Sequence, residues 1–232
     1  MNGIFVTGTD TGVGKTIIAV GIAGAMKRDG IDVGVMKPIA AGIPKKRGFK
    51  SEDAEFLSLA TGCNDDENKV NPVFLPLEAS PLVASKALNL NIDLDKVFSA
   101  FSSLASRHEF VVVEGIGGLM VPIKPNYFVA DMIKTMSLPV LIVCKATLGT
   151  LNHTLLTAKC CKDYCFDVAG IVVNGVRDSN SIAEKTASDA IRELTGLPVI
   201  GVVPYVTELP KQNISMVIDL VSKHVKYDLL IS

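Results

Sequence analysis

The sequence has little excess charge and no long apolar run, and these two lacks narrow the class of protein. Across 232 residues, 23 basic side chains balance 24 acidic ones and leave a net charge of −1. A polybasic surface for nucleic acid is therefore not expected. No apolar run approaches the roughly 20 residues of a membrane-spanning helix, and an apolar strand pattern directly after Asn2 leaves no room for a signal peptide. We expect neither a nucleic-acid nor a membrane partner.

Cysteines are few and odd in number. Five thiols in a chain of this length favour reduced cysteines in a cytoplasmic protein over a disulfide framework. Three of them, Cys160, Cys161 and Cys165, fall on one predicted helix, and His153 is almost in phase with Cys160. Their spacing is not that of a zinc or iron–sulfur site, so core thiols are favoured over a metal site.

What the sequence does have is a glycine-rich loop between its first predicted strand and helix. The strand Gly3–Val6 runs into Thr7-Gly-Thr-Asp-Thr-Gly-Val-Gly-Lys-Thr16. Strand, glycine-rich loop, Gly-Lys-Thr and helix together are typical of a phosphate-binding loop. Lys15 would reach the β- and γ-phosphates of a nucleotide, and the Thr16 hydroxyl would bind Mg²⁺. Thr9 stands where the usual spacing has a glycine, so a glycine-rich turn without ligand remains the alternative.

Strands and helices alternate along the whole chain, without repeats or a linker. This alternation predicts an α/β fold of the P-loop NTPase kind, with one mostly parallel sheet covered by helices on both faces. We expect a single domain over residues 1–232. The further strands are predicted at Ile31–Met36, Phe110–Glu114, Val140–Cys144, Val168–Asn174 and Val199–Val203, and later helices near 80–88, 93–107, 180–195 and 211–226.

Charged side chains follow two of these strands. Lys37 ends one strand because Pro38 cannot continue it, and it would lie beside the phosphate loop if the two strands are neighbours. Glu114 ends an apolar strand and precedes three glycines within residues 115–118. Buried acids are rare unless paired or metal-bound. A solvated lysine and an incidental acid in a turn are the alternatives.

Three further positions are candidates. Ser51 is the expected N-cap of a helix in which Asp53 either complements the helix dipole or faces Mg²⁺. The preceding loop, residues 42–52, has four basic residues that either cover phosphates or are solvated, the second being favoured: Lys45, Lys46, Arg47 and Lys50. Asn174 ends a strand with an amide suited to an adenine edge, and the Asn-Lys-x-Asp pattern of guanine sites is missing there.

Taken together, these motifs resemble the dethiobiotin synthetases, ligases of biotin biosynthesis. The resemblance covers nearly the whole chain and includes the spacing of the loop. Its motifs are Thr7–Thr16, Lys37-Pro38, Asp53-Ala54, Asn71-Pro72, Ser80-Pro81, Glu114-Gly-Ile-Gly-Gly118, Gly149 with Asn152-His153, and Asn174.

The resemblance implies a reaction in which 7,8-diaminononanoate, CO2 and ATP give dethiobiotin, ADP and phosphate, with Mg²⁺. One amine takes up CO2 as a carbamate, the carbamate attacks the γ-phosphate, and the second amine closes a cyclic urea through a carbamic–phosphoric anhydride. It also implies that Lys15 and Lys37 are catalytic and that Thr16, Asp53 and Glu114 hold the metal.

Two more sets of residues follow from the same resemblance. The nucleotide would contact Gly12, Val13, Gly14, Lys15, Thr16, Ile17, Asp53, Glu114, Gly115, Ile116, Gly117, Asn174, Gly175, Pro204, Tyr205, Val206 and Glu208. The diamine would contact Thr11, Lys37, Ala41, Gly117, Gly118, Gly149, Thr150, Leu151 and Asn152. The helix start at Gly149–Asn152 would take the substrate carboxylate from the second subunit of a homodimer.

Three positions depart from the family pattern without removing a metal ligand or lysine, and two rival interpretations are open beside it. Gly12 replaces a frequent acid, Ala41 a frequent serine and Leu82 a usual histidine. A switch ATPase of the partition or division-site kind has a similar loop, but its signature lysine is replaced here by Asp10. Another amide-forming ligase, such as a cobyrinate-type synthetase, would need a glutaminase domain, for which no residues remain.

Overall fold

The strand that carries the phosphate loop lies in the middle of a six-stranded sheet. A computed structural model describes residues 3–177, 181–207 and 213–231. In it the strand order is β10-β9-β8-β1-β5-β2, and every neighbouring pair is parallel. The predicted α/β fold is therefore confirmed. The strand bounds are β1 Gly3–Gly8, β2 Val33–Met36, β5 Phe110–Glu114, β8 Val140–Lys145, β9 Val168–Val176 and β10 Val199–Pro204.

The prediction that Lys37 lies beside the phosphate loop was made on the condition that the two strands are neighbours. β5 lies between β1 and β2, so the strand that ends at Lys37 is not the neighbour of the strand that enters the loop. Pairing instead sets Val6 of β1 beside Glu114 of β5, and Met36 of β2 beside Val113. The ends of these three strands therefore meet at one edge of the sheet, with Glu114 between the loop and Lys37.

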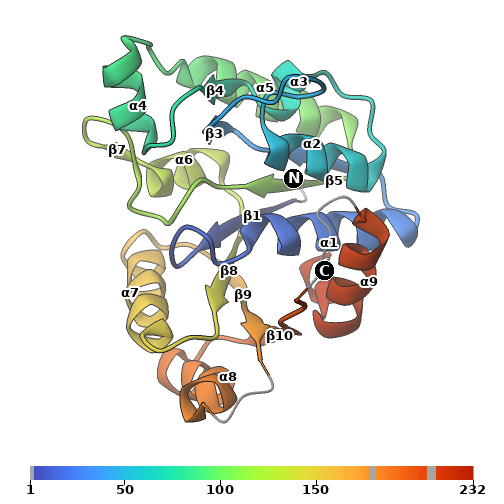
Figure 1. The fold of residues 1–232 in the computed structure, drawn as a ribbon, viewed down its shortest axis with the longest axis vertical. Coiled ribbons are helices and arrows are strands. Elements are labelled where there is room, and N and C mark those ends of the chain that lie inside the picture. The colour runs from blue at the N-terminus through green and yellow to red at the C-terminus, as the bar shows by residue number, and fades with distance from the viewer. Residues whose placement is uncertain (1–2, 178–180, 208–212, 232) are drawn as a thin grey trace.

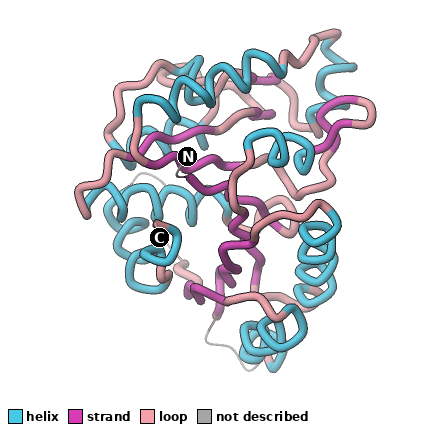
Figure 2. The backbone as a smooth tube through the Cα atoms, turned by 180° about the vertical axis from the view of Figure 1, so that it is seen from behind, coloured by secondary structure: helices cyan, strands magenta, loops and turns pink. Residues whose placement is uncertain are grey.

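Alternation along β1 sends side chains to two separate cores. Phe5 packs with apolar residues of α5, α6, α7 and α8 on one face, whereas Ile4 and Val6 pack with α1, α2 and α9 on the other. Because successive side chains of a strand point to opposite faces, a run buried throughout must be covered on both. Figure 1 shows α1 and α9 side by side, away from α7 and α8, and Figure 2 shows the strands running between groups of helices.

Helices connect the strands as the alternation predicts. Their bounds are α1 Lys15–Arg28, α2 Glu52–Thr61, α3 Glu67–Val70, α4 Pro81–Leu88, α5 Leu94–Arg107, α6 Val129–Met136, α7 Thr150–Asp163, α8 Ile182–Thr195 and α9 Ile214–His224, with a 3-10 turn at Tyr227–Leu230. Within the described ranges, none is both long and apolar enough to cross a membrane.

Several short elements were not predicted. β3 (Ile39–Ala41) pairs with β4 (Val73–Leu75), and β6 (Pro122–Lys124) pairs with β7 (Tyr127–Phe128). The second strand begins at Val33 rather than Ile31. The helix α6 could have been found, because its buried residues Val129, Met132, Ile133 and Met136 are spaced as on one helical face.

Helices α1 and α9 pack unusually close together. A Cβ on Gly21 of α1 would lie 2.3 Å from Cβ of Val221, and one on Gly24 would lie 2.3 Å from the Cδ1 of Ile218. Such distances are far below van der Waals contact, so these two glycines admit the valine and isoleucine of α9. The helix that follows the phosphate loop is thereby held against α9.

Candidate active site

The phosphate loop is shaped by two glycines and pinned by an asparagine. Gly12 and Gly14 have φ angles of 74° and 96°, a region that disfavours other residues. The amide nitrogen Nδ2 of Asn174, at the end of β9, donates to the carbonyl oxygen of Val13 over 2.9 Å. A Cβ on Gly14 would lie 2.0 Å from that nitrogen. The loop therefore requires a glycine there for conformation and for space.

Lys15 folds back over the loop that precedes it. Its ammonium donates to the carbonyl oxygen of Asp10 over 2.9 Å, and only 7% of the residue is exposed. Burial, reinforced by the nearby cation of Lys37, lowers the pKa of Lys15 from 10.5 to about 8, although Glu114, Asp53 and Asp10 oppose the shift. An anion bound at the loop would favour the charged lysine again.

Lys37 is the centre of a buried charge cluster. Its Nζ lies 2.6 Å from Oε1 of Glu114, 3.0 Å from Oδ2 of Asp53 and 3.2 Å from the carbonyl oxygen of Gly115. Lys37 and Glu114 are 3% and 1% exposed. Burial acts to lower the pKa of Lys37, but the two carboxylates outweigh it and raise the pKa above its usual value. Lys37 is therefore not a solvated lysine but a fixed cation.

The main chain of Lys37 is fixed as well. Its N–H donates to the carbonyl oxygen of Val70 over 2.7 Å, and Nδ2 of Asn71 donates to its carbonyl oxygen over 2.6 Å. Asn71, which had no predicted role, thus positions Lys37 from the turn before β4. Its position in the Asn-Pro motif was the available signal.

The three predicted metal ligands converge on this cluster. The Thr16 hydroxyl donates over 2.8 Å to the same Oε1 of Glu114 that accepts from Lys37. The second oxygen of Glu114, Oε2, is buried and has no hydrogen-bond partner in the part of the chain that is described. Two carboxylates and a hydroxyl are the hard oxygen donors that Mg²⁺ prefers. The residues therefore fit a magnesium ion. Asp53 does more than complement the dipole of α2, because it also forms an ion pair with Lys37.

Helix α7, which contains Cys160 and Cys161, offers no comparable metal site. The described residues contain no group of three or more His, Cys, Asp or Glu side chains able to hold a metal. All five cysteines fall in the described ranges and are free thiols. Burial raises the pKa of Cys161 to about 12, as for a core thiol, whereas Cys165 is exposed and so departs from the core position expected.

A cavity of about 1260 Å³ opens over the loop and the charge cluster. Twelve of the predicted residues line it: Thr11, Gly12, Gly14, Lys15, Thr16, Ile17, Lys37, Ala41, Asp53, Glu114, Ile116 and Gly117. Its other walls come from α2, β3, β4 with the loop that follows it, and the start of α9, through residues such as Phe74, Glu78 and Ile214 that were not predicted. The phosphate loop and the candidate substrate residues thus share one space.

Of the four basic residues in the loop before α2, only Lys45 lines this cavity. It forms an ion pair with Glu55 of α2, which also lines the cavity. The main-chain N–H of Lys50 donates over 2.6 Å to Glu67, which ties down the other end of the loop. Lys46 and Arg47 are exposed, as expected for a solvated loop.

Comparison with known proteins decides the family. The sequence profile of the AAA domain family matches residues 2–213. The ATP-dependent dethiobiotin synthetase of Nitrosopumilus maritimus is 41% identical over 217 residues, which cover 94% of this chain and 95% of that protein. That of Bacillus subtilis strain 168 is 36% identical over 232 residues, covering 100% and 98%. The chain belongs to the dethiobiotin synthetase family.

Solved structures show that this dethiobiotin synthetase family member shares its fold with a ParA family ATPase and with MinD cell division proteins. A ParA family ATPase from Chlorobium tepidum superposes with a TM-score of 0.58 at 18% identity, covering 100% of this chain and 98% of that one. The cell division protein MinD of Aquifex aeolicus gives 0.55 at 16%, covering 100% and 94%. At such identities the likeness is one of fold, whereas the sequence likeness to dethiobiotin synthetases extends over the full chain.

In this dethiobiotin synthetase homologue, the predicted adenine residues do not line the cavity, although Asn174 contacts the phosphate loop. β9 and β10 pair so that Asn174 lies beside Val203, next to Pro204. The guanidinium of Arg177 stacks 4.3 Å from the ring centroid of Tyr205. The lining of the cavity does not include Val13, Gly115, Gly118, Asn174, Gly175, Pro204, Tyr205 or Val206. Glu208 lies outside the described residues.

The predicted carboxylate site is also outside the cavity. Gly149, Thr150, Leu151 and Asn152 do not line it. Thr150 is buried with its hydroxyl unpartnered among the described residues, whereas Leu151 and Asn152 are exposed at the start of α7. Within one chain, therefore, the structure does not bring these residues to Lys37.

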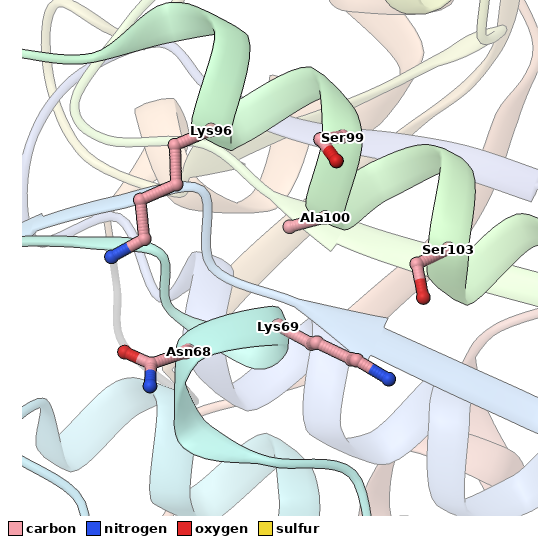
Figure 3. A pocket seen from close by; sticks show the side chains of 6 residues that line it. All are labelled: Asn68, Lys69, Lys96, Ser99, Ala100 and Ser103. Carbon is pink, nitrogen blue, oxygen red and sulfur yellow. The ribbon is translucent and has the colours of Figure 1, made fainter.

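A second, smaller hollow lies between α3 and α5. Figure 3 shows Asn68 and Lys69 of the first helix facing Lys96, Ser99, Ala100 and Ser103 of the second. Its volume is about 270 Å³ and it shares no lining residue with the loop cavity. None of its residues was predicted to act in the reaction.

Proposed function

We propose that this protein uses ATP to join CO2 to 7,8-diaminononanoate and to close the cyclic urea of dethiobiotin. The observation that carries the proposal is the buried cation of Lys37, which shares a cavity with Lys15 of the phosphate loop. The full-length identity to dethiobiotin synthetases, 41% in one case, supports the same reaction. A phosphate loop alone would support only nucleotide binding.

Electrostatics is the main demand of this chemistry. A carbamate and a triphosphate are both anionic, and two unit charges about 4 Å apart repel by about 4 kcal/mol at an effective dielectric constant of about 20. Lys15 and Lys37 line the cavity in which both anions would bind. Since the carboxylates raise the pKa of Lys37, it would stay cationic while charge develops at the phosphoryl group. No covalent nucleophile is needed, because positioning and charge stabilisation can carry phosphoryl transfer.

The proposal includes magnesium, held by Thr16, Asp53 and Glu114. When bound, it would neutralise the phosphate oxygens during transfer. The chain's own contribution is the buried position of Glu114, which fixes its carboxyl oxygens at the end of β5. Burial raises the pKa of this carboxyl against the opposing effect of Lys37, and a bound cation would favour its charged form. Its unpartnered Oε2 supports a ligand role, because a buried carboxylate oxygen without a partner costs free energy.

The diamine would lie on the side of the cavity formed by β3 and the glycines after β5. Thr11, Ala41 and Gly117 line that side, and a Cβ on Gly118 would lie 3.1 Å from the carbonyl oxygen of Gly8. Glycines at positions 117 and 118 would let a ligand approach the backbone closely, where N–H groups would suit the carbamate. Adenine would lie against Asn174, Gly175 and the Pro204–Val206 segment, and Glu208 completes the proposed set.

We further propose a homodimer in which Gly149–Asn152 of one subunit binds the substrate carboxylate of the other. Support comes from exposed leucines around the start of α7, namely Leu148 at 92%, Leu151 at 36% and Leu156 at 60% exposure. Sedimentation at micromolar concentration should give a dimer, and Asn152→Ala should raise KM for the diamine. A chain that stays monomeric and active would contradict the shared site.

The deciding experiment measures phosphate release from ATP and Mg²⁺ with bicarbonate, with and without 7,8-diaminononanoate. Release should depend on the diamine, and mass spectrometry should find a product heavier by one carbonyl minus two hydrogens. Lys37→Ala should abolish turnover while ATP still binds, with Lys46→Ala in the exposed loop as the matched control. Slow hydrolysis indifferent to the diamine would favour a switch ATPase instead. A cytoplasmic location, where ATP is available, belongs to the same proposal.

A further inference from the structure

The ammonium of Lys37 has every donor engaged by the protein itself. A lysine ammonium has three N–H donors. Here the three nearest acceptors are Oε1 of Glu114, Oδ2 of Asp53 and the carbonyl oxygen of Gly115, at 2.6, 3.0 and 3.2 Å. At 3% exposure Lys37 has almost no contact with solvent. In this state the lysine cannot bind a ligand without leaving one of these oxygens.

Two of those acceptors are the carboxylates to which the proposed function assigns the metal. Lys37 and Thr16 both donate to a single oxygen, Oε1 of Glu114. Magnesium binds oxygen ligands at about 2.0–2.1 Å. A divalent ion on the same carboxylates would therefore be a close neighbour of the ammonium, and two cations at such a distance repel strongly in a buried site. The lysine and the metal compete for one position.

We propose that Lys37 fills the cation position between Asp53 and Glu114 in the nucleotide-free protein and keeps that position closed to free Mg²⁺ until phosphates draw the ammonium away. This inference rests on the metal ligands assigned under the proposed function. It adds that one side chain has two successive partners, carboxylates before nucleotide binds and phosphate or carbamate oxygens afterwards. The four-carbon stem of a lysine allows such a swing by rotation alone.

The proposal makes metal and nucleotide binding cooperative. Once the triphosphate binds, its negative charge attracts Lys37 and frees the carboxylates for the metal. Without nucleotide, the same carboxylates are already neutralised, so a free divalent ion gains little. By linkage, each ligand then raises the affinity of the other by the same factor.

Manganese(II) binding to the nucleotide-free protein tests this directly, because unbound Mn²⁺ is measured by electron paramagnetic resonance. Lys37→Met keeps the length of the side chain and removes its charge. We expect it to bind Mn²⁺ about ten-fold tighter or more than the wild type, within the range usual for coupled sites. Lys37→Arg, which keeps a cation, should bind as weakly as the wild type. Equal affinity of the Met variant and the wild type would overturn the proposal.

Lys15→Met is the matched control. Lys15 is also a buried cation of this cavity, but its ammonium donates to a carbonyl oxygen of Asp10 and to no carboxylate among the described residues. Its removal should strengthen Mn²⁺ binding much less than removal of Lys37. An equal gain in both variants would mean that the general charge of the cavity, rather than occupation of one position, weakens metal binding, and would also overturn the proposal.

Two further variants keep the test decisive. In the double variant Lys37→Met/Glu114→Gln, the gain in Mn²⁺ affinity should be lost, because the metal would bind to Glu114 where the lysine was. If the double variant keeps the gain, the metal binds elsewhere and the proposal is refuted. If Lys37→Met does not fold, Lys37→Gln replaces it, because its amide can still donate a hydrogen bond to Glu114. The glutamine is also uncharged, so the same gain in Mn²⁺ affinity is expected. None of these measurements uses ATP or the diamine, so their failure is distinguishable from failure of the proposed reaction.

Discussion

Replacing Gly14 by alanine should destabilise the protein by an amount that can be estimated from the geometry of the phosphate loop. The φ of Gly14 is 96°, and the left-handed region costs other residues about 1–2 kcal/mol. The new Cβ would also lie 2.0 Å from Nδ2 of Asn174. Asn174 must then move and give up its 2.9 Å hydrogen bond to Val13, which is worth about 1 kcal/mol. The expected destabilisation is about 2–3 kcal/mol in total.

Gly12→Ala is the matched control for this effect. Gly12 has a φ of 74°, but a Cβ there would meet no neighbouring atom of the described residues within 4 Å, so only the conformational cost of about 1–2 kcal/mol applies. Urea unfolding followed by circular dichroism measures both variants. In an Asn174→Ala background the cost of Gly14→Ala should fall by about 1 kcal/mol, because the clashing amide is gone.

The double-mutant comparison also gives the refuting result. If Gly14→Ala costs the same with and without the asparagine side chain, the two residues are not coupled and the pinning of the loop by β9 is wrong. A melting temperature lowered by about 5–10 °C for Gly14→Ala would agree with the expected cost for a chain of this size. Destabilisation no greater than that of Gly12→Ala would contradict it.

Three further predictions concern single side chains. Because burial lowers the pKa of Lys15 from 10.5 to about 8, its charge costs the folded state about 3 kcal/mol at neutral pH. That cost disappears as the pH rises from about 8 to 10.5. In urea titrations, the free energy of unfolding of the wild type should therefore rise relative to that of Lys15→Met. A difference that stays constant with pH would contradict the lowered pKa. Asn174→Asp should weaken the preference for ATP over GTP in competition binding, and an unchanged preference would remove Asn174 from the base. Ala41→Ser should lower KM for the diamine by adding a hydroxyl to the cavity wall, and an unchanged KM would place the substrate elsewhere.

Much of this site could be predicted because its residues stand at the carboxyl ends of strands. Lys37 and Glu114 each follow an apolar run, and parallel strands bring such ends to one edge. The order of the strands could not be read from the same pattern, because β1, β2 and β5 all have continuous apolar runs that suit any central place. The contact between Lys37 and Glu114 follows from that order, since β5 lies next to β2.

Other features lacked a periodic signal. β3 and β4 have three residues each, too few for alternation to be recognised. The ion pair of Lys45 with Glu55 joins a loop to a helix, and it depends on how residues 42–50 fold over α2. Asn71 could be noticed by its motif, but its hydrogen bond to the main chain of Lys37 is a tertiary contact that sequence spacing does not encode.

The central place of β1 has a consequence for how the protein is made. β1 ends at Gly8, yet its partners β5 and β8 begin only at Phe110 and Val140, and α1 packs against α9, which begins at Ile214. During synthesis the phosphate loop therefore leaves the ribosome long before the two strands that pair with β1, although α1 and α2 follow the loop closely. The nascent chain therefore keeps β1 without its neighbouring strands until β5 and β8 have been synthesised, and such unpaired strand edges are what makes folding chains prone to aggregate.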